Sequence, residues 1–302
     1  MKKEIRTVKD QILQITTIDE RWYARPTNDP ATGLPTYQYV PSVTYITSFY
    51  PKGVAFYKWL ANTGWNEAEA LKNAGGDRGT KVHQALLELL DGKMVAMGAS
   101  YVTGSTAGPA ELSIEEYSGV MAFVAWWGSV IKETGFAPRV LNREFVVWHD
   151  AEGYAGTIDL LCEIYNPATK AWELWIMDFK TGQYVWPDME CQLSGYKAAF
   201  FTTALRRECR LAILQLGYQR NKASWKFTEV TDQYDLFLAA KRIWAKETEG
   251  EKPKQRDYPL VLQLPPATPV PITPPSTNVP EDQLHRTGAR LVPRSTSRRT
   301  SR

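Results

Sequence analysis

The sequence predicts an α/β domain built on a mixed β-sheet, preceded by a mostly helical region and followed by a disordered tail. Between residues 79 and 250 the hydrophobic patterns run in the order helix, three strands, helix, strand, which is typical of a sheet flanked by helices. Most periodic segments before residue 79 are helical, and the composition changes near residue 250. We therefore expect an N-terminal region with a strand hairpin over 1–78, packed on a core over 79–250, and a tail over 251–302.

The composition favours a globular protein outside the membrane. The chain has 302 residues, of which 43% are hydrophobic and 12% aromatic, enough to bury a sizeable core. No apolar run approaches the roughly 20 residues that span a bilayer. The lysines at the N-terminus are not followed by the apolar block of a secretory signal. We therefore expect a cytoplasmic protein with no membrane partner.

The cysteines indicate buried thiols. Cys162, Cys191 and Cys209 are far apart and each lies in an apolar segment. An odd number of widely spaced cysteines does not form a disulfide framework, so we expect all three to be free.

Charge and proline content separate the tail from the rest of the chain. Residues 251–302 contain nine Lys/Arg and four Asp/Glu, a net charge of +5, whereas the remaining 27 basic and 29 acidic residues give −2. Ten of the 19 prolines also fall in this tail. Such a segment cannot bury enough apolar surface to offset the entropy lost on ordering. The "LVPR" within it resembles the remnant of a thrombin site, with a natural basic tail as the alternative.

The segments before the core strands contain one hairpin and four helices. "RWYARPTNDPATGLPTYQYVP" predicts two short strands around a Pro/Gly turn. Helical periodicity covers residues 54–62, 66–73, 80–91 and 113–132. The third helix is expected to begin after "GGDRG" and to end at Asp91-Gly92, because glycine often marks a helix end.

The core strands follow. Residues 139–150, 153–165 and 170–180 are rich in strand formers, and the short turns "AEGY" and "NPATK" between them predict an antiparallel meander. The remaining expected elements are a helix over 187–204, strands over 210–219 and 224–230, and an amphipathic helix over 232–247.

"WIMDFKTG" places a carboxylate and an ammonium near the end of an apolar strand. Residues two apart on a strand share a face, so Asp178 and Lys180 should project together, with Met177 and Phe179 on the other side. An isolated D-x-K is most often a solvated ion pair at a sheet edge. Only its surroundings favour a functional interpretation.

Asp159, in "GTIDLL", supplies a second carboxylate on the preceding strand. If the two strands form a hairpin across "NPATK", Asp159 and Asp178 converge, and close like charges require a cation between them. Oxygen ligands favour Mg²⁺ or Mn²⁺. Such an ion would bind a phosphate and acidify a water, while Lys180 would orient that water or stabilise charge on phosphorus. This is the chemistry of phosphodiester hydrolysis.

Three further side chains extend the constellation. Gln192 and Tyr196 are spaced i, i+4 and share one face of the next helix, where they could hold a nucleic-acid backbone or position Lys180. His83, expected in the first turn of its helix, is a further candidate metal ligand. The alternative for His83 is the commoner one, a surface histidine or a satisfied core histidine.

In this order, "GTKVH", "REFVV", "GTIDLL", "IMDFKTG" and "QLSGY" resemble the motifs of RecB-like nucleases of the PD-(D/E)XK superfamily, over about residues 79–196. "VPSVTYITSFYPKG" also resembles the N-terminal region of phage exonucleases in this group, from about residue 40. The ordered set of five motifs is specific, whereas any single motif is not. The resemblance implies a metal-dependent DNase of phage or prophage type with a restriction-endonuclease-like αβββαβ core.

The same resemblance assigns roles by motif. It implies His83, Asp159 and Asp178 as metal ligands, Lys180 as the catalytic lysine, and Gln192 and Tyr196 as the supporting catalytic pair. Glu144 matches a frequent acidic position on the first core strand, with a structural ion pair to Arg143 or Lys180 as the alternative.

Two features of some related nucleases are missing from the sequence. There are not four cysteines in the spacing that holds an iron–sulfur cluster, so we expect no cluster. There is no G-x-x-x-x-G-K-[ST] loop, so we expect no helicase motor in this chain. The loop after Lys180 carries Tyr184 and Trp186, for which packing onto neighbouring helices is favoured over stacking on bases.

We therefore expect a Mg²⁺-dependent DNA exonuclease, with Mn²⁺ as a substitute, acting on linear ends in recombination, repair or DNA degradation. A structure-specific endonuclease on the same fold is one alternative. A non-catalytic DNA-binding module is another, although the presence of Asp159, Asp178 and Lys180 together argues against it. The Pro-rich tail is long enough to bind a single-strand-binding protein or a recombinase.

Overall fold

The computed structural model describes residues 4–17, 20–31, 33–103, 108–203, 208–219 and 222–248. The tail expected to be disordered lies outside the described residues. The strands are β1 (Glu4–Lys9), β2 (Ile12–Thr16), β3 (Arg21–Asn28), β4 (Pro35–Pro41), β5 (Ser100–Tyr101), β6 (Ala110–Glu111), β7 (Arg139–His149), β8 (Tyr154–Asn166), β9 (Ala171–Lys180), β10 (Arg210–Leu216) and β11 (Trp225–Val230). The helices are α1 (Val43–Thr47), α2 (Val54–Thr63), α3 (Trp65–Leu90), α4 (Ile114–Thr134), α5 (Pro187–Thr203) and α6 (Tyr234–Glu247).

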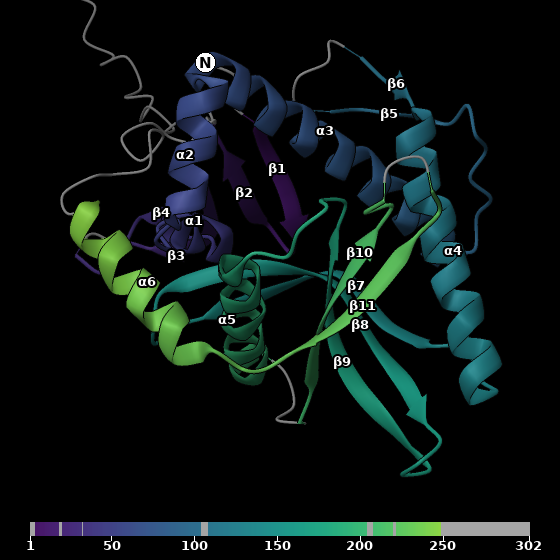
Figure 1. The fold of residues 1–302 in the computed structure, drawn as a ribbon. Coiled ribbons are helices and arrows are strands. Elements are labelled where there is room, and N and C mark those ends of the chain that lie inside the picture. Colours follow the sequence, from purple (N-terminus) through teal and green to yellow (C-terminus); the bar gives the residue numbers. More distant parts are fainter. Residues whose placement is uncertain are drawn as a thin grey trace, which may run out of the picture. The chain divides into compact units, whose positions relative to one another are not determined.

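The central sheet has five strands in the order β11-β10-β9-β8-β7 (Figure 1). β7, β8 and β9 form the predicted antiparallel meander. Helix α5 connects β9 to β10, which lies parallel to β9, and β11 pairs antiparallel with β10. The mixed sheet with helices on its faces is therefore confirmed.

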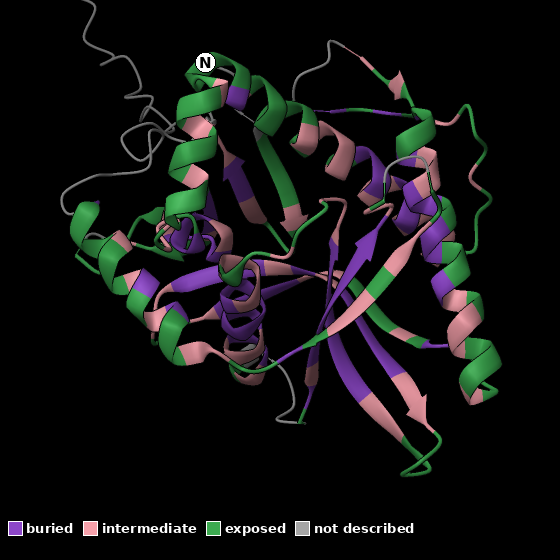
Figure 2. Ribbon diagram, viewed as in Figure 1, coloured by how far each residue is buried: buried purple, intermediate pink, exposed green. Residues whose placement is uncertain are grey.

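Helices cover both faces of this sheet. Ile176 of β9 belongs to the hydrophobic core that includes residues of α1, α5 and α6. Its neighbours Trp175 and Met177 belong to a second core shared with α3 and α4. Alternate residues along the middle strands are thus buried on opposite sides, and Figure 2 shows these strands buried over most of their length. None of the helices in the described part of the chain has the length and apolar character needed to cross a bilayer.

Helix α3 is continuous, and the expected break at "GGDRG" is wrong. Three glycines fall inside the helix, Gly75, Gly76 and Gly79, and none of them has a positive φ. Each glycine costs only about 1 kcal/mol relative to alanine, which the packing of buried residues such as Val82 and Leu86 can offset. His83 therefore lies in the interior of a 26-residue helix and not in a first turn.

The N-terminal region contains more sheet than expected. The predicted hairpin exists as β3 and β4, but β1 and β2 extend it to a four-stranded antiparallel sheet. Tyr23 and Val40 of this sheet pack against Val146, Trp148 and Ala155 of β7 and β8. The N-terminal sheet therefore packs on the strands that carry candidate site residues.

Two close approaches fix the position of α5, one against the sheet and one against α6. A Cβ at Gly156 of β8 would lie 2.4 Å from Tyr196 Cε1, so only glycine admits this helix so near the strand. A Cβ at Gly195 would lie 2.8 Å from the Phe237 ring of α6.

The cysteines Cys162, Cys191 and Cys209 are buried free thiols, as predicted.

The continuity of α3 can be tested at Gly76, which is exposed and has open space around its Cα. Gly76→Ala should raise the free energy of unfolding by about 0.5–1 kcal/mol, because alanine loses less backbone entropy in a helix. Gly128→Ala, an exposed glycine with open space in α4, is the matched control and should give a similar gain in urea unfolding. A loss at Gly76 beside a gain at Gly128 would mean that the helix breaks there.

Candidate functional site

Asp178 and Lys180 project to the same side of β9, as strand alternation predicts. The Lys180 ammonium forms an ion pair with Asp178 Oδ2, while Met177 and Phe179 belong to the core on the opposite face. The Asp178 side chain is only 2% exposed and that of Lys180 20%. Asp178 is therefore buried and Lys180 half-buried, unlike the solvated edge pair considered from the sequence.

Gln192 of α5 connects these residues. Its Nε2 donates to Asp178 Oδ1 (3.0 Å) and to Tyr196 OH (2.8 Å), and its Oε1 accepts from Lys180 Nζ (3.4 Å). An ammonium has three donors, and the described residues supply partners for two of those of Lys180. The predicted helical pair thus holds the charged groups of β9 in one arrangement.

Asp159 lies where β8 and β9 separate. The β8–β9 ladder extends to the pair Leu160–Met177, and β9 then continues beside β10. Two residues beyond Met177, Phe179 N donates to the Asp159 carboxylate (2.8 Å to Oδ2). The side chain of Asp159 therefore occupies a fork between two strands, near the end of β9.

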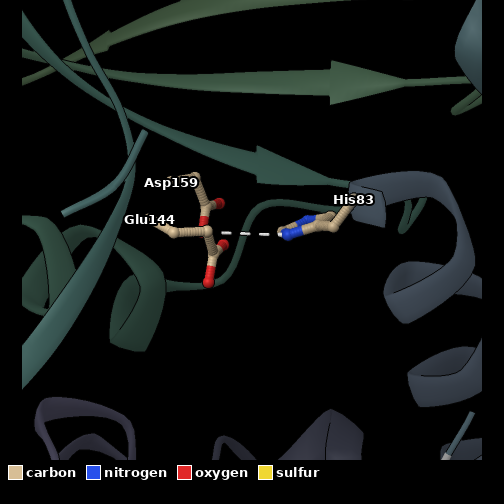
Figure 3. Close-up of side chains that lie close together, drawn as sticks. All are labelled: His83, Glu144 and Asp159. Atoms are coloured by element: carbon tan, nitrogen blue, oxygen red, sulfur yellow. Dashed lines mark ion pairs between the residues drawn. The ribbon is translucent and has the colours of Figure 1, made fainter. Parts of the chain in front are cut away.

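Three possible metal ligands meet at this fork (Figure 3). One ligand atom each from His83, Glu144 and Asp159 lies within 4.8 Å of the others. His83 reaches the fork from α3, with Nδ1 3.7 Å from Asp159 Oδ1 and Nε2 3.1 Å from Phe179 O. Two opposite bonds to a Mg²⁺ ion span about 4.2 Å, so the group has a suitable size for one small cation.

The structure rearranges the predicted ligand set. It brings the predicted ligands His83 and Asp159 together, and the third member of this group is Glu144. The predicted ligand Asp178 instead contacts Lys180 and Gln192. From its sequence motif Glu144 had no firm role, because its place beside Asp159 depends on how β7 pairs with β8.

The pairing of β7 with β8 brings Glu144 to the site. The neighbours of Glu144, Arg143 and Phe145, pair with Leu160 and Ile158, which flank Asp159. Glu144 has φ +47°, a left-handed conformation that is uncommon for residues with a side chain and that often marks functional sites.

The ion pair of Glu144 is neither of the two considered from the sequence. Its carboxylate lies 3.7 Å from the Arg6 guanidinium, while Arg143 pairs with Asp91 and Lys180 with Asp178.

Burial and charge crowding perturb the titration of this cluster. Burial, with repulsion from Asp178, raises the pKa of Asp159 to about 8. Burial and the nearby Asp159 also raise the pKa of Glu144, and burial lowers the pKa of His83. Burial alone would lower the pKa of Lys180, but attraction to Asp178 and Asp159 raises it above its ordinary value. Two carboxylates that resist ionisation beside a neutral imidazole are the donor set that a cation would stabilise.

A hydrogen-bonded chain ties the N-terminal sheet to the site. Arg6 Nε donates to Gln14 Oε1 (2.8 Å), and Gln14 Nε2 donates to Tyr23 OH (2.7 Å). Tyr23 OH lies 2.7 Å from Thr157 Oγ1 on β8, two residues before Asp159. The chain fixes the guanidinium of Arg6 beside Glu144, so the N-terminal sheet forms one wall of the site.

The loop after Lys180 differs from expectation. Tyr184 and Trp186 are 67% and 48% exposed, so neither is buried under the neighbouring helices. Their ring centroids lie 6.0 Å apart, so the two aromatic side chains form an exposed pair close to the charged end of β9.

The raised pKa of Asp159 predicts a pH-dependent effect of Asp159→Asn in EDTA. Between about pH 4 and pH 8 the folded state retains a proton that the unfolded state has released, so the stability of the parent protein falls as pH rises through this window. Asparagine stays neutral, so the stability of the variant relative to that of the parent should increase as the pH rises to about 8. Urea unfolding at pH 5, 6.5 and 8 measures this gain.

Asp178→Asn is the matched control for that experiment. It removes the partner of the buried Lys180 ammonium and should cost about 3 kcal/mol at neutral pH. Equal losses for both variants would assign Asp159 a structural ion-pair role instead.

The series of hydrogen bonds that passes through Tyr23 can be tested with Tyr23→Phe. The variant loses the hydroxyl that joins Gln14 and Thr157 and leaves a buried amide donor without its acceptor, so it should lose about 1–3 kcal/mol in urea unfolding. Tyr57→Phe on α2 changes an exposed tyrosine and should have no measurable effect. Unchanged stability for Tyr23→Phe would show that the chain does not hold the N-terminal sheet.

Comparison of the sequence with models of known protein families and with curated proteins gave no match to either. The chemistry of this chain is therefore inferred from its own residues and their geometry.

Proposed function

We propose that this chain is a metal-dependent deoxyribonuclease that hydrolyses phosphodiester bonds. The observation that carries the proposal is the juxtaposition of the His83, Glu144 and Asp159 group with the buried Lys180 ammonium. The backbone of Phe179 links them, because its N–H donates to Asp159, its carbonyl oxygen lies 3.1 Å from His83, and Lys180 is the next residue. A ligand group and a cation are thus fixed at the end of one strand.

The ligand group suits Mg²⁺ or Mn²⁺. When bound, such an ion supplies Lewis-acid activation of a phosphate and lowers the pKa of a coordinated water. With Nε2–H of His83 donating to the Phe179 carbonyl, Nδ1 faces Asp159 as an acceptor, which is the tautomer that a metal ligand requires. Asp159 and Glu144 would add two oxygen ligands.

Lys180 would act on the reacting phosphate or on the attacking water. Asp178 and Gln192 each occupy one donor of its ammonium, which leaves a third for the substrate. The ammonium stays protonated at neutral pH because the neighbouring carboxylates raise its pKa. In this proposal Asp178, Gln192 and Tyr196 are positioning residues, and Lys180 contacts the reacting atoms.

DNA is the proposed substrate, with exonucleolytic cleavage of linear ends during recombination, repair or degradation. The five ordered motifs that resemble RecB-like nucleases support this substrate. Digestion of end-labelled linear, nicked and circular DNA in Mg²⁺, with and without EDTA, tests the activity and separates exonuclease from endonuclease. Cleavage of linear DNA alone would support the exonuclease.

Lys180→Ala should lower the cleavage rate about a hundredfold or more, because it removes charge stabilisation needed chiefly in the transition state. DNA affinity in Ca²⁺ should change much less. Lys180→Arg should not restore activity, because a broad guanidinium cannot replace one compact donor in a buried position. Rates are measured at a temperature at which circular dichroism shows each variant folded.

Lys132→Ala, in the last turn of α4, is the control and should cleave at the parent rate. If the unmodified protein binds DNA but cuts none in Mg²⁺ or Mn²⁺, and Lys180→Ala only weakens binding, the chain is a DNA-binding module and the nuclease proposal is wrong.

A further inference from the structure

A pocket of about 310 Å³ lies beside the proposed catalytic centre, between α3, α4 and the loop that follows β9. Arg78 of α3 lines it, five residues before His83, which is about 7.5 Å along a helix axis. Thr181 lines it from the other side and directly follows Lys180. The pocket therefore lies near the end of β9, on the side of the sheet that α3 and α4 cover, whereas the Lys180 side chain projects to the α5 side.

The chemistry of the pocket suits a flat, neutral and polar ligand. Gly75, Gly119 and Gly217 contribute walls without side chains. Arg78 Nη1 lies 3.6 Å from Glu115 Oε2, so the two charges compensate and the pocket does not favour an anion such as a phosphate.

Polar residues line the pocket beside this ion pair. Arg78 Nε has no hydrogen-bond acceptor among the described residues, but it is buried and reaches a ligand in the pocket only if the side chain moves. Ser118 and Gln183 provide further donors and acceptors at the wall. A nucleobase has the flat shape and the mixed polar edge that these groups match.

Tyr184 adds an aromatic surface to the pocket. Tyr184 lines the pocket and is 67% exposed, and the ring of Trp186 lies beside its own ring. The loop that carries both rings is anchored, because Gln215 Nε2 donates to Gly182 O (3.2 Å) and Val185 packs against the core. Exposed aromatic rings held in place are the usual surface on which unpaired bases stack.

We infer that this pocket binds an unpaired nucleobase of the substrate strand, stacked on Tyr184, so that the enzyme acts on single-stranded DNA or on single-stranded ends. A base inside a duplex is paired and stacked, and it enters a pocket only after extrusion from the helix. The inference rests on the proposed nuclease function and names its substrate class.

Two variants test the pocket in Ca²⁺, by fluorescence anisotropy with a single-stranded oligonucleotide and a blunt duplex of the same sequence. Tyr184→Ala should weaken single-strand binding about tenfold, the scale of one lost base stack, and leave duplex binding unchanged. Gly75→Leu should block the pocket and have the same selective effect. Gly76→Leu makes the same change at the adjacent exposed position, which does not line the pocket, and should bind as the parent does.

A 2-aminopurine base in the oligonucleotide gives a direct readout, because stacking quenches its fluorescence. Quenching at one position near the bound end should occur with the parent and with Gly76→Leu, and it should disappear with Gly75→Leu. Phe136→Ala, an exposed ring just beyond the far end of α4 and roughly 20 Å from Gly119, is the control for loss of an aromatic side chain.

The outcomes separate this inference from the nuclease proposal. If the parent cuts DNA but Tyr184→Ala and Gly75→Leu bind single strands normally, or lose single-strand and duplex binding equally, the inference is wrong and the nuclease proposal stands. If the selective loss occurs but no DNA is cut in Mg²⁺ or Mn²⁺, the base pocket stands and the nuclease proposal is wrong.

Discussion

The hydrogen bond from Phe179 N to the Asp159 carboxylate is the contact on which the site depends. In a continuous ladder this amide would donate to a carbonyl of β8, and the two strands would stay together. Here a side-chain oxygen accepts the hydrogen bond instead, while β8 remains paired with β7 and the end of β9 with β10. The space opened by this separation admits His83 from one helix and leaves the far side of β9 to Gln192 from another. The Asp159 carboxylate thus lies where two strands separate, between the group that it forms with His83 and Glu144 and the ion pair of Asp178 and Lys180.

The end of β9 could be predicted in detail, because the alternation of side chains along a strand depends only on neighbouring residues. Asp178 and Lys180 share a face for this reason, and the i, i+4 spacing of Gln192 and Tyr196 places both beside them. Glu144 could not be assigned in the same way. Its place opposite Asp159 follows from the register of β7 against β8, which shifts between Val140 and Asn142, and an irregularity of this kind changes which residues meet across a sheet.

Two other features escaped sequence analysis for physical reasons. The glycines of α3 have the composition of a loop, but their conformational cost is small against the packing of that helix on α4 and the sheet. The hairpin of β1 and β2 turns through Asp10 and Gln11, both with positive φ, where Asn-Gly would have been the recognisable sequence. Without that signal β1 and β2 were not predicted, and with them the role of Arg6 and Gln14 in the wall of the site.

Because α3 is continuous, it fixes the distance between Arg78 and His83 in the proposed enzyme. The same rigid rod carries Arg78 of the base pocket and His83 of the ligand group, so their separation is set by helix geometry and does not vary with loop motion. A strand whose last base occupied the pocket would always present the same linkage for hydrolysis, and we expect products of uniform length. One residue inserted between Arg78 and His83 would turn Arg78 about 100° around the helix axis relative to His83, given 3.6 residues per turn, and would disturb the wall that α3 contributes to the pocket.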